Sequence, residues 1–348
     1  MDGVKCPFTI YHSPFTITIS SLLSIISSLN QDRLVELPIF FFYIETFLEP
    51  VDSFPTDCLL PTDNCLLTKI SKPMNPIAMN LLVYGPDMNE SVLSELAFIQ
   101  EVGYQGVEIP VFNVDLAHWS SWKKEVDRLG LQPFACAIAG PAENLISPDP
   151  AIRAAGIAYL KGAVDVAAYL GSPYLSGPFH SALGVFTGAK ATQQEIDWSI
   201  VGIREVADHA ATKNITLCLE YLNRFESYLV SCADELYALV EQINHPYVEI
   251  MFDTFHANIE EVSTADAIRR IAKRTPHIQL SESTRGILGE GQVNWPSVFQ
   301  SIKDINYAGW LVVEAFSEKL PAAHIWRKMF NSERELVDKS FKFIHGKW

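Results

Sequence analysis

The 348-residue chain lacks several patterns that would assign it to a common class of protein. No two of its six cysteines form a CxxC pair, and no P-loop or cluster of lysine and arginine is present to receive a phosphate. Neither apolar run in the first 73 residues reaches the roughly 20 residues that a membrane-spanning helix needs. These absences argue against a phosphorylated substrate and against a membrane-spanning helix. A chain of this length does not need a disulfide framework, which favours a reducing, cytoplasmic compartment.

Basic residues are also scarce, because 26 of them stand against 41 acidic residues and give a net charge of −15. This charge repels nucleic acid and anionic membranes, and it favours neutral or cationic small molecules as ligands. Hydrophobic residues make up 48% of the chain and charged residues 19%, values that are typical of a globular protein with a sizeable core.

Residues 1–73 differ from the rest of the chain because they are rich in Ser, Thr, Phe and Pro. We interpret them as an N-terminal extension, disordered or weakly structured, with no catalytic role. A degenerate targeting segment and a weak membrane-surface anchor are the alternatives. Met74 opens a sequence that reads like an independent start, so residues 74–348 are assigned to the catalytic domain.

From residue 77 onward, apolar runs alternate with segments of helical periodicity. The eight apolar runs are 77–85, 106–112, 131–140, 173–179, 214–222, 247–253, 277–283 and 309–316. Several of the helical segments end in glycine, at Gly103, Gly130 and Gly171, which suits a left-handed C-cap. Eight strand–helix units in about 270 residues predict a (β/α)8 TIM barrel. A doubly wound open sheet is the alternative, although no GxGxxG fingerprint follows the first run.

Four oxygen-bearing side chains stand at the ends of four successive apolar runs: Glu220, Asp253, Gln279 and Glu314. Their separations of 33, 26 and 35 residues each match one strand–helix–strand unit. In a parallel barrel these side chains would converge at the C-terminal mouth, where the chemistry of such barrels takes place. Because three carboxylates at one place repel one another without a cation, the spacing predicts a divalent metal and an enzyme.

The segments that follow these runs carry further polar residues. Asn223, Arg224 and Glu226 come after Glu220, in the segment EYLNRFESYL. A second segment, SESTRGILGEGQVNW, carries Glu282 and Arg285 among three glycines, which permit close approach of the backbone to a ligand or movement of a lid.

These motifs together resemble a known family. ExxNRFE, DTFHxNIEE, HxxxSExxRG followed by GEGxxxW, and VVEAF are similar to the D-tagatose 3-epimerase/D-psicose (allulose) 3-epimerase family of xylose-isomerase-like TIM barrels. The resemblance covers roughly residues 77–345. It implies an isomerase that inverts C3 of a ketose through a cis-enediolate, with two glutamates as acid and base, and a homodimer or homotetramer.

The resemblance also implies the roles of individual residues. Glu220 and Glu314 take the catalytic positions and bind the metal, together with Asp253 and the residue at position 279. The positions that contact the sugar are Glu226, His256 and Arg285. The expected metal is Mn²⁺, with Mg²⁺ or Co²⁺ as alternatives.

The chain departs from the family's pattern at Gln279, where the epimerases carry a histidine ligand. A glutamine carbonyl is a neutral, harder donor than imidazole, so we expect a preference for oxygen-seeking Mn²⁺ or Mg²⁺. Thr284 stands where the epimerases commonly have asparagine.

An epimerase or lyase acting on 3-keto-glycosides or keto-cyclitols is the nearest alternative function, and a non-catalytic sugar-binding barrel is another. Nuclease chemistry is disfavoured by the net charge and by the small number of histidines, nine.

The segment HIWRKMF, with Trp326, Met329 and Phe330, is interpreted as helical. Its apolar side chains form either a dimer face or ordinary core packing.

Overall fold

The structure is a computed structural model that describes residues 74–347. The proposed N-terminal extension, and with it Cys6, Cys58 and Cys65, lies outside the described residues, so its assignment stays a prediction. Within the described part of the chain, Cys136, Cys218 and Cys232 are free thiols. No helix in that part is long and apolar enough to cross a membrane.

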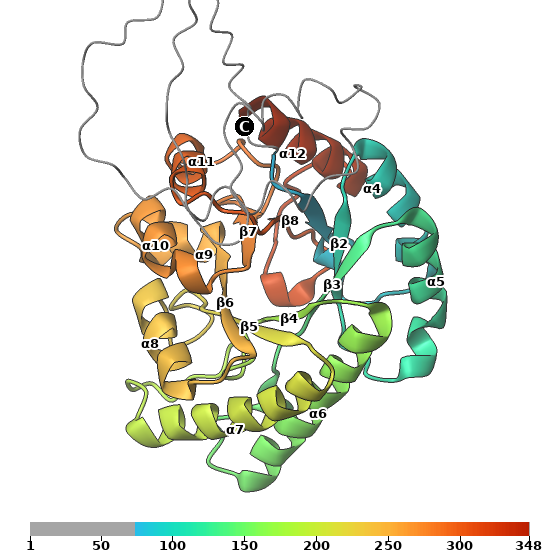
Figure 1. Cartoon of the computed structure of the whole chain (residues 1–348). Coiled ribbons are helices and arrows are strands. Elements are labelled where there is room, and N and C mark those ends of the chain that lie inside the picture. Colours follow the sequence, from blue (N-terminus) through green and yellow to red (C-terminus); the bar gives the residue numbers. More distant parts are fainter. Residues whose placement is uncertain (1–73, 348) are drawn as a thin grey trace, which may run out of the picture. The chain divides into compact units, whose positions relative to one another are not determined.

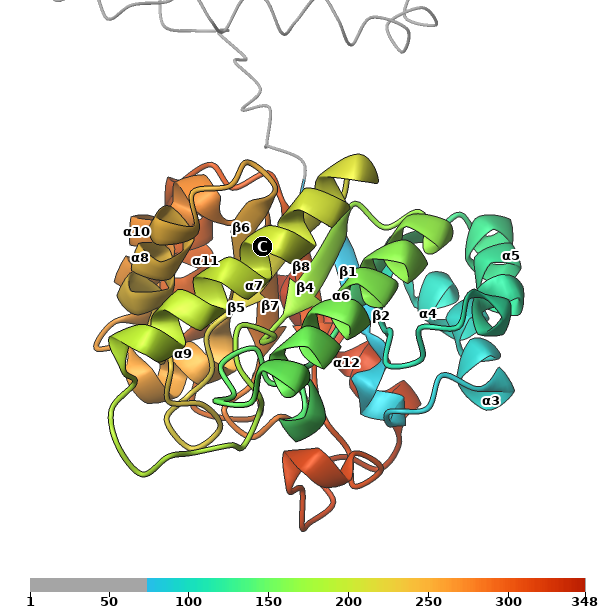
Figure 2. The same cartoon turned by 90° about the horizontal axis from the view of Figure 1, so that it is seen from below.

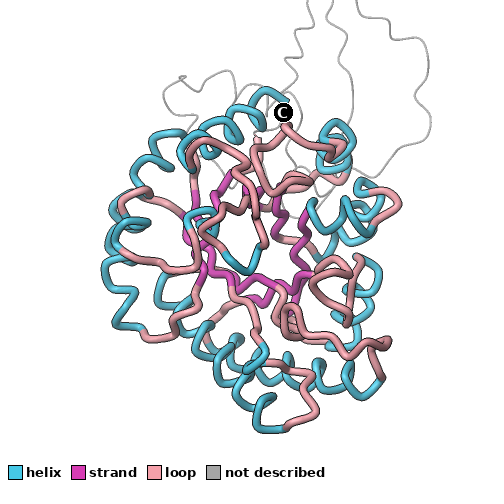
Figure 3. Tube along the Cα trace, turned by 180° about the vertical axis from the view of Figure 1, so that it is seen from behind, coloured by secondary structure: helices cyan, strands magenta, loops and turns pink. Residues whose placement is uncertain are grey.

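Eight parallel strands form a closed barrel in sequence order, with β8 paired to β1. Figure 3 shows this ring of strands inside a ring of helices. The strands are β1 (Ile77–Asn80), β2 (Gly106–Pro110), β3 (Gln132–Cys136), β4 (Tyr174–Gly177), β5 (Thr216–Glu220), β6 (Val248–Asp253), β7 (His277–Ser281) and β8 (Trp310–Glu314). The predicted TIM barrel is confirmed, and the doubly wound sheet is excluded because that sheet is open.

Helices cover the outside of the barrel (Figure 1). They are α3 (Glu90–Leu93), α4 (Leu96–Val102), α5 (Ser120–Leu129), α6 (Pro150–Leu170), α7 (Gln193–Thr212), α8 (Ala233–Ile243), α9 (Thr254–Glu260), α10 (Thr264–Ile271), α11 (Trp295–Asp304) and α12 (Glu333–Lys347). The predicted glycine caps are confirmed, because Gly103, Gly130 and Gly171 follow α4, α5 and α6 with left-handed φ angles.

The core lies between the strands and the inner faces of these helices. Apolar residues that alternate along each strand point outward and pack against helix residues such as Leu160, Ile203 and Leu239, all buried. Burial of this apolar layer is the main force that holds the barrel closed.

The elements differ from the predicted ones mainly at their ends. The run 77–85 is a strand only as far as Asn80, whose side chain accepts from the backbone N–H of Leu82 and starts the 3₁₀ helix η3 (Leu81–Tyr84). The segment HIWRKMF is not helical, so that prediction is wrong. It follows the short 3₁₀ helix η7 (Pro321–Ala323), and Trp326 within it is 82% exposed instead of packed in a core. Figure 2 shows the red segment between β8 and α12 projecting beyond the ends of the strands.

Gly177, at the end of β4, allows two strands to approach closely at the barrel mouth. Its φ is +132°, and a Cβ there would stand 2.1 Å from the carbonyl oxygen of Ala137. We expect Gly177→Ala to lower the free energy of unfolding by roughly 3 kcal/mol or more, because it combines backbone strain with a clash against backbone. Urea unfolding measures this loss.

Gly171→Ala is the matched control, because its φ is +89° but no atom lies within 4 Å of the added Cβ. This variant should lose only about 1–2 kcal/mol, the cost of placing a Cβ in left-handed backbone. Equal losses for the two variants would show that the close approach at Gly177 does not matter.

Candidate active site

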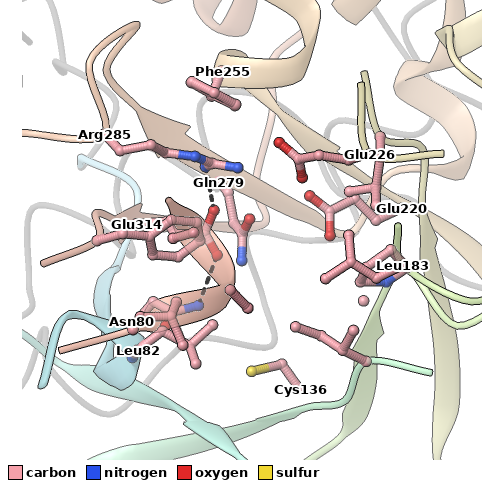
Figure 4. A pocket seen from close by; sticks show the side chains of 18 of the residues that line it. Asn80, Leu82, Cys136, Leu183, Glu220, Glu226, Phe255, Gln279, Arg285 and Glu314 are labelled. Carbon is pink, nitrogen blue, oxygen red and sulfur yellow. Dashed lines mark hydrogen bonds and ion pairs between the residues drawn. The ribbon is translucent and has the colours of Figure 1, made fainter. Parts of the chain in front are cut away.

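A cavity of about 460 Å³ opens at the C-terminal ends of the strands. Part of its lining is polar and carries carboxylates, amides and a guanidinium (Figure 4), together with the imidazole of His256. The rest of the lining is largely apolar and includes side chains such as Leu82, Phe112, Ile138, Leu183 and Leu222. The cavity therefore places a small cluster of chemically active groups beside a space large enough for a monosaccharide.

Most residues that the sequence predicted for the site line this cavity. They are Glu220, Glu226, His256, Gln279, Arg285 and Glu314. Asp253 is not among the lining residues; its carboxylate is buried and accepts a hydrogen bond from Arg285, which does line the cavity. Asp253 and Gln279 are nevertheless aligned partners across β6 and β7, so their side chains start at the same level of the barrel.

The guanidinium of Arg285 binds two of the predicted carboxylates at once. Its Nη1 donates to Asp253 Oδ2 across 2.8 Å and to Glu314 Oε2 across 2.5 Å. The rings of Phe255 and Phe316 lie against the guanidinium, with centroids 3.7 and 4.4 Å from its central carbon. Arg285 thus supplies a fixed positive charge inside the acidic cluster, held in a cation–π sandwich.

The carboxylates are in an environment that disfavours their negative charge. Burial, followed by repulsion from Glu314 and Asp253, raises the pKa of Glu220 well above its usual value. Burial also raises the pKa of Glu314 well above its usual value, although the neighbouring Arg285 acts in the opposite direction. One guanidinium does not balance three buried carboxylates, so the site attracts a further cation or a proton.

His256 is a neutral imidazole that faces the same cluster. Burial, and next the charge of Arg285, lowers the pKa of His256 well below its usual value. Both ring nitrogens face a donor, because the backbone N–H of Asn223 lies 3.0 Å from Nδ1 and Arg285 Nη2 lies 3.0 Å from Nε2. A neutral imidazole accepts at only one nitrogen, and the backbone N–H of Asn223 donates to Nδ1, so this hydrogen bond assigns the proton to Nε2. Arg285 Nη2 has no acceptor and therefore contacts Nε2 without a hydrogen bond, and Nε2 is 3.5 Å from both Glu220 Oε1 and Asp253 Oδ2.

Gln279 presents its carbonyl oxygen to the cavity. Its Nε2 donates to Glu108 Oε2 across 2.7 Å, whereas its buried Oε1 has no hydrogen-bond partner among the described residues. Figure 4 shows the Gln279 side chain between Glu220 and Glu314. His277, two residues earlier, is fully buried with its Nε2 3.0 Å from Glu108 Oε1, and it does not line the cavity.

The donor atoms present fit a divalent cation. Ligating atoms of Glu220, Asp253 and His256 lie within 4.8 Å of one another. Because the Nε2 of His256 carries a proton, it is a donor and not a ligand in this arrangement. The unpartnered carbonyl oxygen of Gln279 is the free acceptor beside the carboxylates, so the available set consists of oxygen donors, which hard cations prefer.

Other polar residues of the predicted loops hold the loops themselves. Arg224 is exposed and pairs with Glu260 of α9. The side chain of Asn223 donates to Glu226 Oε1 across 2.8 Å. Glu282 is buried and accepts from Trp295 Nε1 and from three backbone N–H groups, so it fixes the path of the loop that carries Arg285.

Three site residues were not identified from the sequence: Asn80, Glu108 and His180. Asn80 contacts Glu314 from the neighbouring strand β1, whereas Glu108 contacts Gln279 from β2, which is not adjacent to β7. The Nε2–H of His180 donates to the backbone carbonyl of Glu220 across 2.9 Å. The only sequence signal for Glu108 is a carboxylate inside the apolar run GVEIPVF.

A family model described as "Xylose isomerase-like TIM barrel" matches residues 96–341 of the chain. The chain belongs to this family. Within it, the chain is 31% identical over 254 residues to the ketose 3-epimerase of Arthrobacter globiformis, which covers 71% of this chain and 88% of that protein. It is also 29% identical to the L-ribulose 3-epimerase of Methylomonas sp. (strain DH-1), over 73% of this chain and 90% of that protein.

Solved structures of the xylose isomerase-like family agree with this placement. A D-allulose 3-epimerase from Methylomonas sp. in complex with D-allulose aligns with a TM-score of 0.74 at 29% identity, covering 79% of this chain and 97% of that one. These relatives confirm the resemblance to the ketose 3-epimerases, and with it the prediction of an enzyme of the isomerase class that handles a small sugar molecule.

The buried side chain of His180 should make the free energy of unfolding depend on pH. Burial lowers the pKa of His180 from 6.5 to about 4. In the unfolded chain this histidine is protonated below pH 6.5, whereas in the folded chain it stays neutral until about pH 4. The free energy of unfolding therefore falls as the pH drops from 6.5 to 4. Between pH 7 and pH 5, we expect His180→Gln to lose about 2 kcal/mol less unfolding free energy than the original chain.

Urea titrations at the two pH values measure this difference. His345→Gln, which removes an exposed histidine of α12, is the control and should follow the original chain. An unchanged pH dependence in His180→Gln would contradict a buried neutral His180.

Proposed function

We propose that this chain is a divalent-metal-dependent ketose 3-epimerase, which inverts the carbon next to the ketone of a free ketose. The observation that carries the proposal is the approach of Glu220 and Glu314 to one sugar-sized cavity from different strands (Figure 4). Both carboxylates are 5% exposed and have raised pKa values, so each exchanges protons more readily than a solvated glutamate does.

Glu220, Asp253, Gln279 and Glu314 would hold the metal ion. When bound, a divalent ion supplies positive charge that stabilises the negative charge developing on the ketone oxygen. Asp253 is bound to Arg285, but each carboxylate has two oxygens and Arg285 contacts only Oδ2 of Asp253 and Oε2 of Glu314. The remaining oxygens, Asp253 Oδ1 and Glu314 Oε1, accept one hydrogen bond each, from the backbone N–H of Phe255 and from Asn80. Each keeps a second lone pair that could bind the metal alongside the carbonyl of Gln279.

The two glutamates move the protons. One removes the proton from C3 and the other returns a proton to the opposite face, and the sugar is a cis-enediolate between the two transfers. Which glutamate is the base depends on the configuration of the sugar, and the roles exchange in the reverse reaction. Cytoplasmic ketoses are the substrates that fit this proposal, since the free cysteines favour a reducing compartment.

The neighbouring polar groups bind the reacting end of the sugar. His256 offers its Nε2–H, and Arg285 offers guanidinium donors, so both donate to the sugar's oxygens. Glu226 accepts from a sugar hydroxyl with the oxygen that Asn223 leaves free. The apolar part of the lining excludes water from the enediolate and prevents its side reactions.

A sugar panel tests the proposal. The full-length chain with added Mn²⁺ is incubated in D₂O with D-fructose, D-psicose, D-tagatose and L-ribulose, and in parallel with 3-keto-glucosides. We expect interconversion of C3 epimers of at least one free ketose, with deuterium entering C3 because the proton lost to a glutamate exchanges with solvent. Conversion of the keto-glucosides alone would contradict the proposal in favour of the keto-glycoside alternative, and no conversion of any sugar would favour a sugar-binding barrel.

Glu314→Gln provides the control for this assay. The amide keeps the shape and an oxygen donor but cannot take up the C3 proton, so turnover should disappear while metal stays bound. Retention of more than a tenth of the activity would count against Glu314 as an acid–base residue.

The metal preference depends on Gln279. An amide oxygen favours Mg²⁺ and Mn²⁺, whereas imidazole favours Co²⁺, so Gln279→His should shift relative affinity toward Co²⁺ by roughly tenfold. Competitive titration of Mn²⁺ against Co²⁺ measures the shift. Gln300→His, on the exposed surface of α11, is the control and should leave the ratio unchanged; the same ratio in both variants would show that Gln279 is not a ligand.

A further inference from the structure

A second buried polar layer lies beneath the cavity and centres on Glu108 of β2. This glutamate is 0% exposed, and its carboxylate receives three side-chain donors: Asn80 Nδ2 at 2.7 Å, Ser176 Oγ at 2.6 Å and Gln279 Nε2 at 2.7 Å. His277 Nε2 lies 3.0 Å from its Oε1. A carboxylate surrounded by donors from β1, β4 and β7 links strands across the whole interior of the barrel.

Glu108 is the acceptor in each of these side-chain hydrogen bonds. Asn80 and Gln279 donate to its Oε2 and Ser176 donates to its Oε1, so both carboxylate oxygens are used as acceptors. A side chain that meets Glu108 at these oxygens therefore has to present a donor.

This requirement decides which way the amide of Gln279 points. Only the NH₂ group of Gln279 can face Glu108, because a carbonyl oxygen in the same place would put two acceptor oxygens 2.7 Å apart with no hydrogen between them. The carbonyl oxygen consequently points away from Glu108, and it is the buried Oε1 that has no partner among the described residues.

Asn80 links Glu108 to a second proposed ligand, Glu314, through hydrogen bonds. Its Nδ2 donates both to Glu108 Oε2 and to Glu314 Oε1, the latter across 3.1 Å. Its Oδ1 accepts from the backbone N–H of Leu82 across 2.8 Å, which prevents the amide from turning over. Figure 4 shows this Asn80–Glu314 contact at the base of the cavity.

We propose that Glu108 is a positioning residue of the metal site, which orients the carbonyl oxygen of Gln279 toward the ion and holds Glu314 through Asn80. The inference rests on the proposed metal site but goes beyond it, because Glu108 touches neither the ion nor the sugar. Groups behind metal ligands commonly change metal affinity by about 10–100-fold when they are replaced. The competing interpretation is that Glu108 only fills the polar interior beside the buried His277 and has no effect on metal binding.

The test first replaces the carboxylate of Glu108 and then exchanges the side-chain types at positions 108 and 279. Glu108→Gln replaces the carboxylate with an amide that can present either its oxygen or its NH₂ group to Gln279, so the carbonyl of Gln279 loses its defined direction. We expect Mn²⁺ to bind at least tenfold more weakly, as measured by calorimetric titration of the full-length protein. In the double variant Glu108→Gln/Gln279→Glu, the donor and acceptor are exchanged and the second residue again presents an oxygen, so Mn²⁺ affinity should return to the original value or exceed it.

Ser176→Ala is the matched control, because it removes one hydrogen bond to Glu108 without touching a proposed ligand. Its Mn²⁺ affinity should stay within about threefold of the original, although it loses stability. A folded Glu108→Gln protein with unchanged affinity, or a double variant as weak as the single one, would overturn the inference. If Glu108→Gln does not fold, Asn80→Ser decides, since it keeps Glu108 and breaks the link to Glu314; unchanged affinity there overturns the inference too.

These measurements distinguish a failure of the proposed metal site from a failure of the proposed role of Glu108. An original chain that binds no Mn²⁺ would refute the metal site itself. An original chain that binds Mn²⁺ and epimerises a ketose, alongside a Glu108→Gln variant that binds Mn²⁺ equally well, would refute only the role of Glu108.

Discussion

The central constraint on this barrel is the burial of negative charge at its mouth. Glu220, Asp253 and Glu314 are each at most 5% exposed, and they end three of the last four strands. Carboxylates in such a place are costly unless positive charge or donors surround them. Arg285 supplies one positive charge, and its own position is secured by two aromatic rings and by a loop that Glu282 holds in shape. The acidity that remains is what suits the site to a divalent cation.

The same constraint connects the fold to the proposed chemistry. A closed barrel brings side chains from non-adjacent strands to one cavity, so Glu220 and Glu314 line that cavity from different strands. Burial raises their pKa values, and a neutral His256 with its proton on Nε2 adds a donor without adding charge. Below them, Glu108 provides acceptors for the amides of Asn80 and Gln279, so the orientation of the upper layer depends on the lower one.

The strands and the polar side chains at their ends could be predicted from the sequence because both depend on local pattern. Each apolar run between helical segments is a strand, and a carboxylate that ends such a run stands out, as Glu220 and Glu314 do. The layer beneath could not be predicted in this way. Glu108 meets Gln279 across the interior, a contact set by the closure and stagger of the barrel, and spacing along the chain does not encode it. The position of Arg285 on Asp253 likewise depends on the fold of a long loop, and HIWRKMF has helical spacing but no helix.

The most direct test of the account is a crystal structure of the full-length protein grown with Mn²⁺, with anomalous scattering recorded near the manganese absorption edge. The account predicts a single strong peak in the cavity, coordinated by oxygens of Glu220, Asp253, Gln279 and Glu314, with Gln279 Nε2 still on Glu108. A peak bound through His256, or no peak among these side chains at saturating Mn²⁺, would contradict it.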